Sequence, residues 1–414
     1  MASESQYRRG GSTVLVFIAC CLVRIVRAAA ATATAAPVTY VFGDSLTDIG
    51  NNKFLQYSLA RSDYPWYGVD YPGGQPTGRF TNGRTIGDII SSKLGISTAP
   101  PPYLSLSAQD DALLGGVNYA SGGAGILNDT GLYFIQRLSF DDQITCFERT
   151  KVAIEAKIGK DGATKLLNQA VYFVGMGSND YVNNFLQPFL ADAQQYTHDE
   201  FVDLLLSTLE KQFTRLHQLG ARTLVFHGLG PLGCIPSQRA KSKKGGCLKR
   251  VNEWVQVFNK GVRRLLISLN AQLPGARLAF ADTYQAVNNL IQNPAAYGNT
   301  ATTNSTDITP HMHMHMHVIY YLHSNICLFD LLGFKISNTS CCNVDTTIGG
   351  LCLPNSKLCS NREDYVFWDA FHPTDAANVV IANALFADPQ LQRQLVNGAH
   401  APAPSAHAPA PAPH

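Results

Sequence analysis

The stretch VTYVFGDS, residues 38–45, begins as a run of apolar, β-branched residues and breaks at Gly-Asp-Ser. Such a run predicts a buried strand that ends in a polar turn. Four later segments repeat the design, each a short apolar run ending in glycine or small polar residues: GVNYASGG (116–123), AVYFVGMGSND (170–180), RTLVFHGLG (222–230) and ARLAFADTY (276–284). Continuous apolar strands of this kind are what a parallel sheet covered on both faces requires.

Helical periodicity fills the intervals between the expected strands, in segments 199–219, 252–273 and 374–386. The first stops at Gly220, and the third has Thr374 as a candidate N-cap. Strands that alternate with helices predict right-handed βαβ units and one parallel sheet. In such sheets ligands bind beyond the carboxyl ends of the strands, and those ends carry Ser45, Gly123 and Asn179.

The composition is that of an ordinary globular protein, with 414 residues, 45% hydrophobic and 15% charged. This length allows one large α/β domain or two smaller ones. The formal net charge of +2 implies no charge-driven partner such as nucleic acid.

The N-terminus has the pattern of a secretory signal peptide, assigned to residues 1–36. Two arginines precede the apolar run 14–23, which is too short for a membrane span, and small residues follow it. Arg24 and Arg27 leave the cleavage site open, and an uncleaved extension is the alternative. The expected location is extracellular, including the cell wall, with no integral membrane span.

Cysteine usage agrees with secretion, which permits disulfides. Cys234 and Cys247 bracket a basic loop, and a tight late cluster contains Cys341, Cys342, Cys352 and Cys359. Zinc is the alternative for this cluster, but the cluster contains no histidine, so we expect disulfides. Which cysteines pair with one another is not predicted. Cys146 is a candidate free thiol, and Asn128 and Asn338 are candidate glycosylation sites.

Ser45 follows the first expected strand, where its hydroxyl would be exposed, although an ordinary helix N-cap has the same appearance. A serine nucleophile needs a base. His372 lies three residues after Asp369 in DAFHPT (369–374), a spacing that lets a carboxylate orient an imidazole toward a serine. The same spacing also occurs as a simple capping arrangement. Packing or a helix start accounts for His198, His217 and His227.

Five blocks in order carry a family resemblance: FGDSLTDIGNN (42–52), NYASGGAGIL (118–127), VGMGSNDY (174–181), GLGPLGCIP (228–236) and FWDAFHPT (367–374). Together they closely resemble the plant GDSL esterase/lipases of the SGNH hydrolase superfamily, from about Val38 to Pro389 with one interruption. The resemblance implies a flavodoxin-like fold, a three-layer α/β/α sandwich around a central parallel sheet. It also implies carboxylic ester hydrolysis with no metal or cofactor.

The resemblance implies a role for each matching residue. Ser45 would be the nucleophile, His372 the base and Asp369 the residue that orients it. Gly123 and Asn179 would join the Ser45 backbone N–H in an oxyanion hole, with the neighbouring Gly122 as the alternative glycine.

GLGPLG (228–233) also matches the dinucleotide pattern G-x-G-x-x-G. No periodic helix follows it, and no acidic residue ends the next strand at the usual distance, so we exclude NAD. The family has this segment as a loop near the substrate cleft.

The family pattern is interrupted by residues 299–333, which include HMHMHMH (311–317). Deleting them joins Tyr297-Gly298 directly to Phe334. The codons for Gly-Asn at the start and for Leu-Gly at the end can contain GT and AG, the dinucleotides found at intron boundaries. We interpret the insertion as a retained intron that is translated. Adventitious metal binding by the histidines is the second interpretation, and a lid over the cleft is the third. The hydrolase domain would comprise 37–298 and 334–392, followed by a disordered Ala/Pro tail, 393–414.

The sequence therefore predicts a secreted serine esterase or lipase, expected to be a monomer acting on a small-molecule or lipid ester. Two alternatives stay open. The same residues would serve acyl transfer, and the chain would be a non-catalytic glycoprotein if the insertion disrupts it. The acyl chain and the alcohol of the substrate are not predicted.

Overall fold

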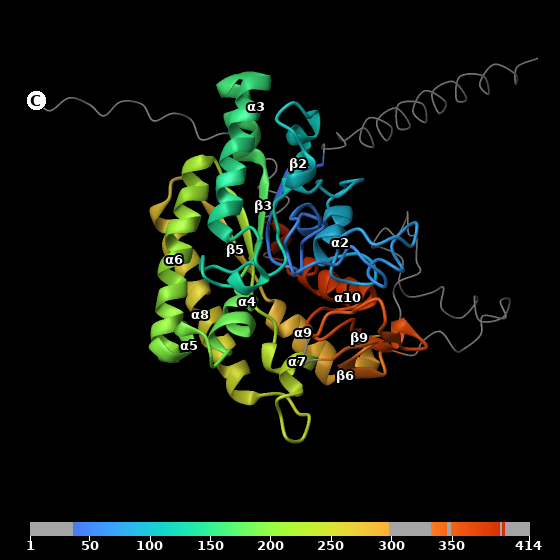
Figure 1. Ribbon diagram of the computed structural model, residues 1–414. Coiled ribbons are helices and arrows are strands. Elements are labelled where there is room, and N and C mark those ends of the chain that lie inside the picture. The colour runs from blue at the N-terminus through green and yellow to red at the C-terminus, as the bar shows by residue number, and fades with distance from the viewer. Residues whose placement is uncertain (1–35, 298–332, 346–348, 390, 394–414) are drawn as a thin grey trace, which may run out of the picture. The chain divides into compact units, whose positions relative to one another are not determined.

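The computed structural model describes residues 36–297, 333–345, 349–389 and 391–393 (Figure 1). The expected signal peptide, the insertion and the Ala/Pro tail lie outside the described residues, apart from one residue at the edge of each. Those assignments stay predictions. No described helix is long and apolar enough to cross a membrane.

A five-stranded parallel sheet forms the centre of the fold, in the order β2-β1-β3-β4-β5. Its strands are β1 (Thr39–Gly43), β2 (Gly116–Asn118), β3 (Val171–Gly175), β4 (Thr223–His227) and β5 (Arg277–Ala281). All five lie in segments where the sequence predicts a strand. This order is the flavodoxin-like one, in which the chain reverses direction across the sheet between β1 and β3 and ligands bind at that point.

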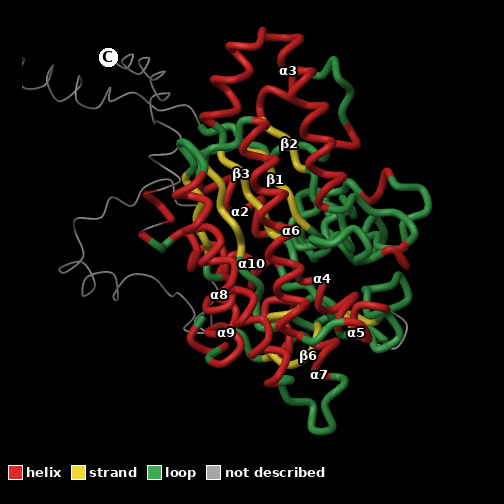
Figure 2. Tube along the Cα trace, turned by 90° about the vertical axis from the view of Figure 1, so that its left-hand side faces the viewer, coloured by secondary structure: helices red, strands yellow, loops and turns green. Residues whose placement is uncertain are grey.

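Two groups of helices cover the sheet on opposite sides (Figure 1). One group comprises α3 (Phe140–Gln169), α6 (His198–Leu219) and α8 (Lys249–Gln272). The other comprises α2 (Ile86–Lys93), α9 (Thr283–Gln292) and α10 (Asp375–Phe386). The predicted α/β fold with helices on both faces is therefore confirmed, and the turned view in Figure 2 shows the strands of the sheet side by side.

The helix ends form where the sequence predicts them. The Thr374 side chain accepts a hydrogen bond from the Ala377 N–H and so caps α10. At the end of α6, Gly220 adopts φ 120°, in the left-handed region that a side chain disfavours.

Short elements connect the layers beyond the carboxyl ends of the strands. They are α4 (Ser178–Asp180), α5 (Ala191–Gln195), α7 (Pro236–Arg239), β6 (Ile336–Ser340), β7 (Cys342–Asn343), β8 (Lys357–Leu358) and β9 (Tyr365–Phe367). The pairs β6–β9 and β7–β8 form two small sheets separate from the main one. Around them a second, smaller core contains Tyr67, Phe80, Trp368 and three half-cystines.

Gln143 of α3 fixes the end of β1, immediately before Asp44 and Ser45. Its buried amide accepts from the Gly43 N–H (2.9 Å) and donates to the Gly43 carbonyl (2.8 Å). It also donates to the Leu138 carbonyl. The side chain thus satisfies the Gly43 N–H, while the Gly43 carbonyl also accepts from the Ser121 N–H at 3.0 Å.

We predict that Gln143→Leu lowers the free energy of unfolding by about 2 kcal/mol, because it leaves the buried Gly43 N–H without an acceptor. Urea denaturation of the purified protein measures the change. The control is Gln272→Leu on the exposed surface of α8, for which a change below about 0.5 kcal/mol is expected. Equal losses in both variants would contradict the assigned role.

Candidate active site

The three residues predicted to form a catalytic triad meet in space. Ser45 follows the end of β1, and its Oγ lies 2.7 Å from Nε2 of His372. On the other side of the ring, Nδ1 lies 2.8 Å from both carboxylate oxygens of Asp369. Because Nδ1 faces a carboxylate, it carries the proton, and Nε2 is left to accept from the serine hydroxyl.

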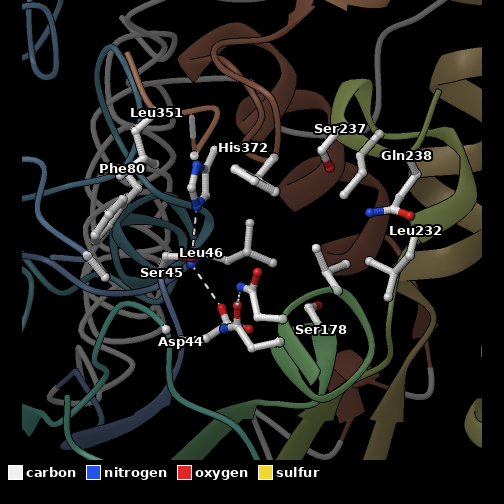
Figure 3. Close-up of a pocket in the computed structure, with 18 of the residues that line it drawn as sticks. Asp44, Ser45, Leu46, Phe80, Ser178, Leu232, Ser237, Gln238, Leu351 and His372 are labelled. Carbon is white, nitrogen blue, oxygen red and sulfur yellow. Dashed lines mark hydrogen bonds between the residues drawn. The ribbon is translucent and has the colours of Figure 1, made fainter. Parts of the chain in front are cut away.

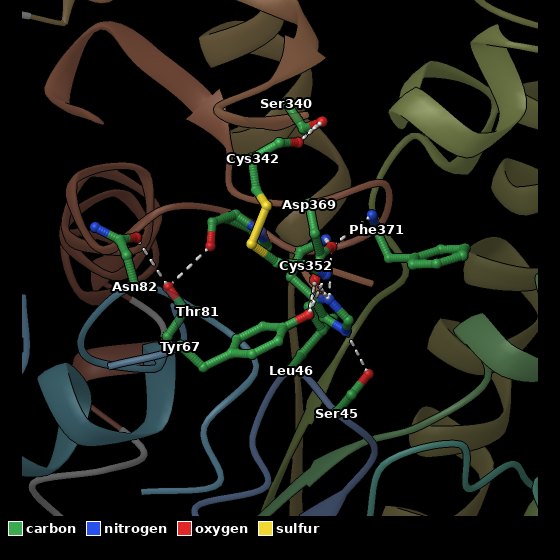
Figure 4. Close-up of polar contacts among 12 residues, drawn as sticks. Ser45, Leu46, Tyr67, Thr81, Asn82, Ser340, Cys342, Cys352, Asp369 and Phe371 are labelled. Carbon is green, nitrogen blue, oxygen red and sulfur yellow. Dashed lines mark hydrogen bonds and ion pairs between the residues drawn. A yellow bond between two sulfur atoms is a disulfide. The ribbon is translucent and has the colours of Figure 1, made fainter. Parts of the chain in front are cut away.

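Asp369 is fully buried and is surrounded by hydrogen-bond donors (Figure 4). Its Oδ1 accepts from the backbone N–H groups of Phe371 (2.8 Å) and His372 (2.9 Å). Its Oδ2 accepts from the Tyr67 hydroxyl at 2.6 Å. Burial, together with the charge of Asp369, raises the pKa of Tyr67 well above its usual range, so the phenol keeps its proton and donates it.

The sequence does not predict the Tyr67 contact. Tyr64 lines the cleft, whereas Tyr67 is buried behind the triad. The two residues of the contact are 302 positions apart, and nothing in the local pattern of either one indicates the other.

The late cysteine cluster lies behind the triad as two disulfides, Cys341–Cys359 and Cys342–Cys352. The Cys352 N–H donates to the Tyr67 hydroxyl at 3.0 Å, so the disulfide loop continues the hydrogen-bond chain that reaches Ser45. The expected disulfides are thus present, with a connectivity that the sequence left open. The described residues contain no group of three His, Cys, Asp or Glu able to hold a metal ion.

The other cysteines in the described part of the chain behave as expected. Cys234 and Cys247 form a disulfide across the basic loop, and Cys146 is a buried free thiol.

The structure distinguishes the two glycines considered for the oxyanion hole. The Gly122 N–H donates to Asp48 at 3.0 Å and is therefore occupied. Gly123 lines the cavity, and its N–H makes no hydrogen bond to any described residue. The geometry therefore favours Gly123.

Asn179, the other predicted donor, stands just beyond β3. Its Nδ2 donates to the Ala124 carbonyl at 2.9 Å, and its Oδ1 accepts from Asn183. An amide nitrogen carries two protons, so one remains for a ligand in the cavity that Asn179 lines.

Buried carboxyl groups fix the loops that carry these donors. Asp48 accepts from the N–H groups of Gly50 (2.7 Å), Asn51 (2.8 Å) and Gly122, which ties the Ser45 loop to the glycine loop. Burial raises the pKa of Asp48 to about 6, although these hydrogen bonds lower it in part. Sequence reasoning missed this role.

Asp180 and Asp44 complete the set of buried carboxyl groups around the site. Asp180 accepts from the N–H groups of Ile126 and Leu127 and from the Thr130 hydroxyl. Burial raises its pKa to about 6, and the pKa of Asp44, next to Ser45, to about 7.

Packing or hydrogen bonding accounts for the other described histidines, although Nε2 of His227 has no hydrogen-bond partner among the described residues. His198 begins α6 and stacks on Trp254 with ring centroids 4.9 Å apart. His217 lies 2.9 Å from the Pro274 carbonyl. His227 is enclosed at the end of β4, where burial lowers its pKa to about 4.

Ser45 and His372 open onto a cavity of about 650 Å³, large enough for a drug-sized molecule (Figure 3). Most of its wall is apolar, including Leu46, Phe80, Phe134, Val182, Leu232 and Phe371. Gly230 and Pro231 of the GLGPLG segment also line it, as the resemblance implied.

Comparisons with known proteins agree with this geometry. The sequence model described as "GDSL-like Lipase/Acylhydrolase" matches residues 40–385. GDSL esterase/lipase At5g37690 of Arabidopsis thaliana is 61% identical over 371 residues, which are 90% of this chain and 93% of the relative. GDSL esterase/lipase At1g74460 of the same plant is 43% identical over 370 residues, 89% and 91% of the two chains. The resemblance inferred from the five sequence blocks is confirmed.

We predict that Asp48 makes the native state less stable as pH rises. Its native pKa of about 6 lies above the unfolded value of about 3.9, so the native state binds the proton more tightly. Relative to Asp48→Asn, the wild-type free energy of unfolding should therefore fall by about 2 kcal/mol from about pH 4 to pH 8.

Urea denaturation across this pH range tests the Asp48 prediction, with Asp203→Asn on the exposed face of α6 as control. The difference in the free energy of unfolding between wild type and Asp203→Asn should not vary with pH. If wild type instead became more stable relative to Asp48→Asn as pH rises, the hydrogen bonds to the Asp48 carboxylate would outweigh its burial.

Proposed function

The chain belongs to the family of GDSL-like lipases and acylhydrolases, and as such is a carboxylic ester hydrolase; we propose that it is a secreted serine esterase acting through an acyl-enzyme on Ser45. The observation that carries the mechanism is the 2.7 Å contact between Ser45 Oγ and His372 Nε2, with Asp369 behind the ring. This is the arrangement that activates a serine hydroxyl.

Acylation begins when Ser45 Oγ attacks the ester carbonyl and His372 Nε2 takes the hydroxyl proton. The imidazolium that forms is stabilised by the Asp369 carboxylate. When the tetrahedral intermediate collapses, the C–O bond to the alcohol breaks and Nε2 returns the proton to the leaving oxygen. Ser45 is left acylated.

The negative oxygen of the intermediate would be held by three donors: the backbone N–H groups of Ser45 and Gly123 and the free amide proton of Asn179. They come from loops that Asp48 and Asp180 fix in place, so little reorganisation is needed as charge develops. The loss of one donor of this kind typically costs about 10²–10³ in rate.

Deacylation repeats the sequence with water. His372 removes a proton from a water molecule, which attacks the acyl carbonyl, and the acid is released as Ser45 regains its proton. All proton transfers in this scheme use side chains of the chain itself.

Secretion is supported by the disulfides at three places in the described chain and by the signal-like N-terminal sequence. The substrate class is supported by the cavity. Its apolar wall next to Ser45 suits an acyl chain, because burial of each methylene contributes about 0.8 kcal/mol.

We predict that the secreted protein hydrolyses p-nitrophenyl esters and that Ser45→Ala lowers kcat/KM by about 10⁴-fold or more. Nitrophenol release along a series from acetate to palmitate measures this. Wild type, protein lacking 299–333 and the exposed-serine control Ser92→Ala are assayed in parallel. Activity that survives Ser45→Ala would refute the mechanism, and a folded deletion protein inactive on every ester would favour acyl transfer or a non-catalytic role.

We predict that Tyr67→Phe lowers kcat/KM about tenfold and moves the acid limb of its pH profile to higher pH. The Tyr67 hydroxyl withdraws charge from Asp369, and without it the carboxylate stabilises the imidazolium more strongly. The free base that catalysis needs then forms only at higher pH.

The matched control for this change is Tyr64→Phe, whose ring centroid lies 5.5 Å from that of Tyr67. The acid limb of the kcat/KM pH profile of Tyr64→Phe should coincide with that of wild type. If Tyr67→Phe reduced thermal stability but left the acid limb in place, Tyr67 would serve packing alone.

A further inference from the structure

The mouth of the cavity is surrounded by apolar side chains that water can reach. Four residues line the cavity and are at the same time well exposed: Leu59 (61%), Tyr133 (42%), Phe189 (71%) and Leu353 (38%). They come from four separate segments of the chain, so no single loop accounts for them. Side chains that face both the cavity and the solvent mark its opening, and we call these four residues the apolar rim.

Two hydrogen-bonded loops extend the apolar rim over the surface. The Leu59 N–H donates to the Phe134 carbonyl at 3.0 Å, and the Tyr57 N–H donates to Gln136 Oε1 at 2.7 Å. The two loops joined in this way carry four further exposed side chains, those of Phe54, Tyr57, Leu132 and Ile135. With the rim, they make up eight of the twelve large apolar side chains exposed in the described part of the chain. Such a concentration marks an interaction surface.

Ile135 is held at this surface by an unfavourable backbone. Its φ of 69° and ψ of −56° are those of a γ-turn, which is closed by the Gln136 N–H donating to the Phe134 carbonyl at 2.8 Å. A β-branched residue rarely adopts a positive φ. Because the side chain is 61% exposed, burial within the fold does not compensate for this strain. A strained and exposed isoleucine beside the cavity therefore indicates a contact with something outside the chain.

A basic loop borders the same opening. It follows α7, is closed by the Cys234–Cys247 disulfide, and projects from the lower end of the molecule in Figure 1. Lys241 lines the cavity and is exposed, and Lys243 and Lys244 are exposed beyond it. Residues 235–246 contain no acidic side chain, so the loop presents a positive charge that it does not neutralise itself.

The combination of these two features selects the kind of partner. Proteins that lie on an anionic bilayer place apolar side chains at the boundary of the acyl chains and lysines among the headgroups. A protein partner seated on the apolar rim would close the way to Ser45. A lipid surface would instead bring its own esters to the opening, and a lipid could enter the apolar cavity without crossing water.

We propose that the apolar rim, the two loops beside it and the basic loop dock the protein on an anionic lipid surface, with the cavity opening toward the lipid. This inference deepens the proposed function and rests on it for the class of substrate. It assigns the exposed apolar and basic residues to binding of the surface, and leaves the chemistry to Ser45 and His372.

Vesicle binding tests the docking surface without catalysis. The protein carries Ser45→Ala, so that the lipid stays intact, and binding is measured by co-sedimentation. One set of vesicles contains equal parts of phosphatidylglycerol and phosphatidylcholine, and the other contains phosphatidylcholine alone. We expect the anionic vesicles to bind at least about tenfold more tightly at low salt, and high salt to remove this advantage.

The further change Tyr57→Asp/Ile135→Asp tests the apolar contribution. It should weaken binding to both kinds of vesicle by about tenfold or more, because charged side chains resist transfer into the acyl boundary. The matched control is Val152→Asp/Ile267→Asp, which alters equally exposed apolar residues of α3 and α8 outside the cavity lining and should bind like the parent protein. Both variants should keep the melting temperature of the parent, since all four side chains are exposed.

The change Lys243→Gln/Lys244→Gln tests the basic loop. It should weaken binding to the anionic vesicles by about tenfold or more and leave binding to phosphatidylcholine unchanged. Lys211→Gln/Lys260→Gln, on the exposed surface of α6 and α8, is the control and should retain the preference for anionic vesicles.

Three results would overturn the docking surface. They are binding to neither kind of vesicle, equal binding by the Tyr57→Asp/Ile135→Asp protein and its control, and binding to soluble polygalacturonate without binding to vesicles. The last result would assign the lysines to an acidic polymer. If wild type hydrolyses p-nitrophenyl esters but the protein binds no vesicle, only the docking surface fails. If vesicles are bound but wild type hydrolyses no ester, the proposed function fails instead.

Discussion

A carboxylate removed from water must be supplied with donors, and the architecture around Asp369 follows from this constraint. The side chain is fully buried, and its oxygens accept from two backbone N–H groups, the Tyr67 hydroxyl and the His372 ring. The Tyr67 hydroxyl accepts in turn from Cys352 in a disulfide loop. The small second core is therefore more than a peripheral addition to the sheet, because it provides the dry environment in which one charge holds the imidazole.

Much of this arrangement is predictable from the sequence, for reasons that differ between its parts. A strand covered on both faces leaves an uninterrupted apolar run, and Gly220 and Thr374 mark helix ends through local backbone chemistry. Ser45, Asp369 and His372 stand in blocks whose order identifies the family. The roles of Tyr67 and Asp48 are not predictable from the sequence, because they consist of contacts between segments that no periodicity or short motif connects.

The site combines two kinds of environment that ordinarily conflict. Its donors require fixed polar groups, while the cavity above Ser45 is largely apolar. The conflict is resolved by placing the polar scaffold below the floor of the cavity. Asp48 and Asp180 pair with backbone N–H groups on the far side of the loops, so only selected donors face the substrate.

The separation of 327 residues between Ser45 and His372 has a consequence for biosynthesis. Ribosomes release the chain from its N-terminus, so Ser45 and the loops that carry Gly123 and Asn179 emerge well before His372. The central sheet can assemble while the polypeptide still lacks any means of activating its serine. Reactivity toward esters thus arises only with the last segment of the fold.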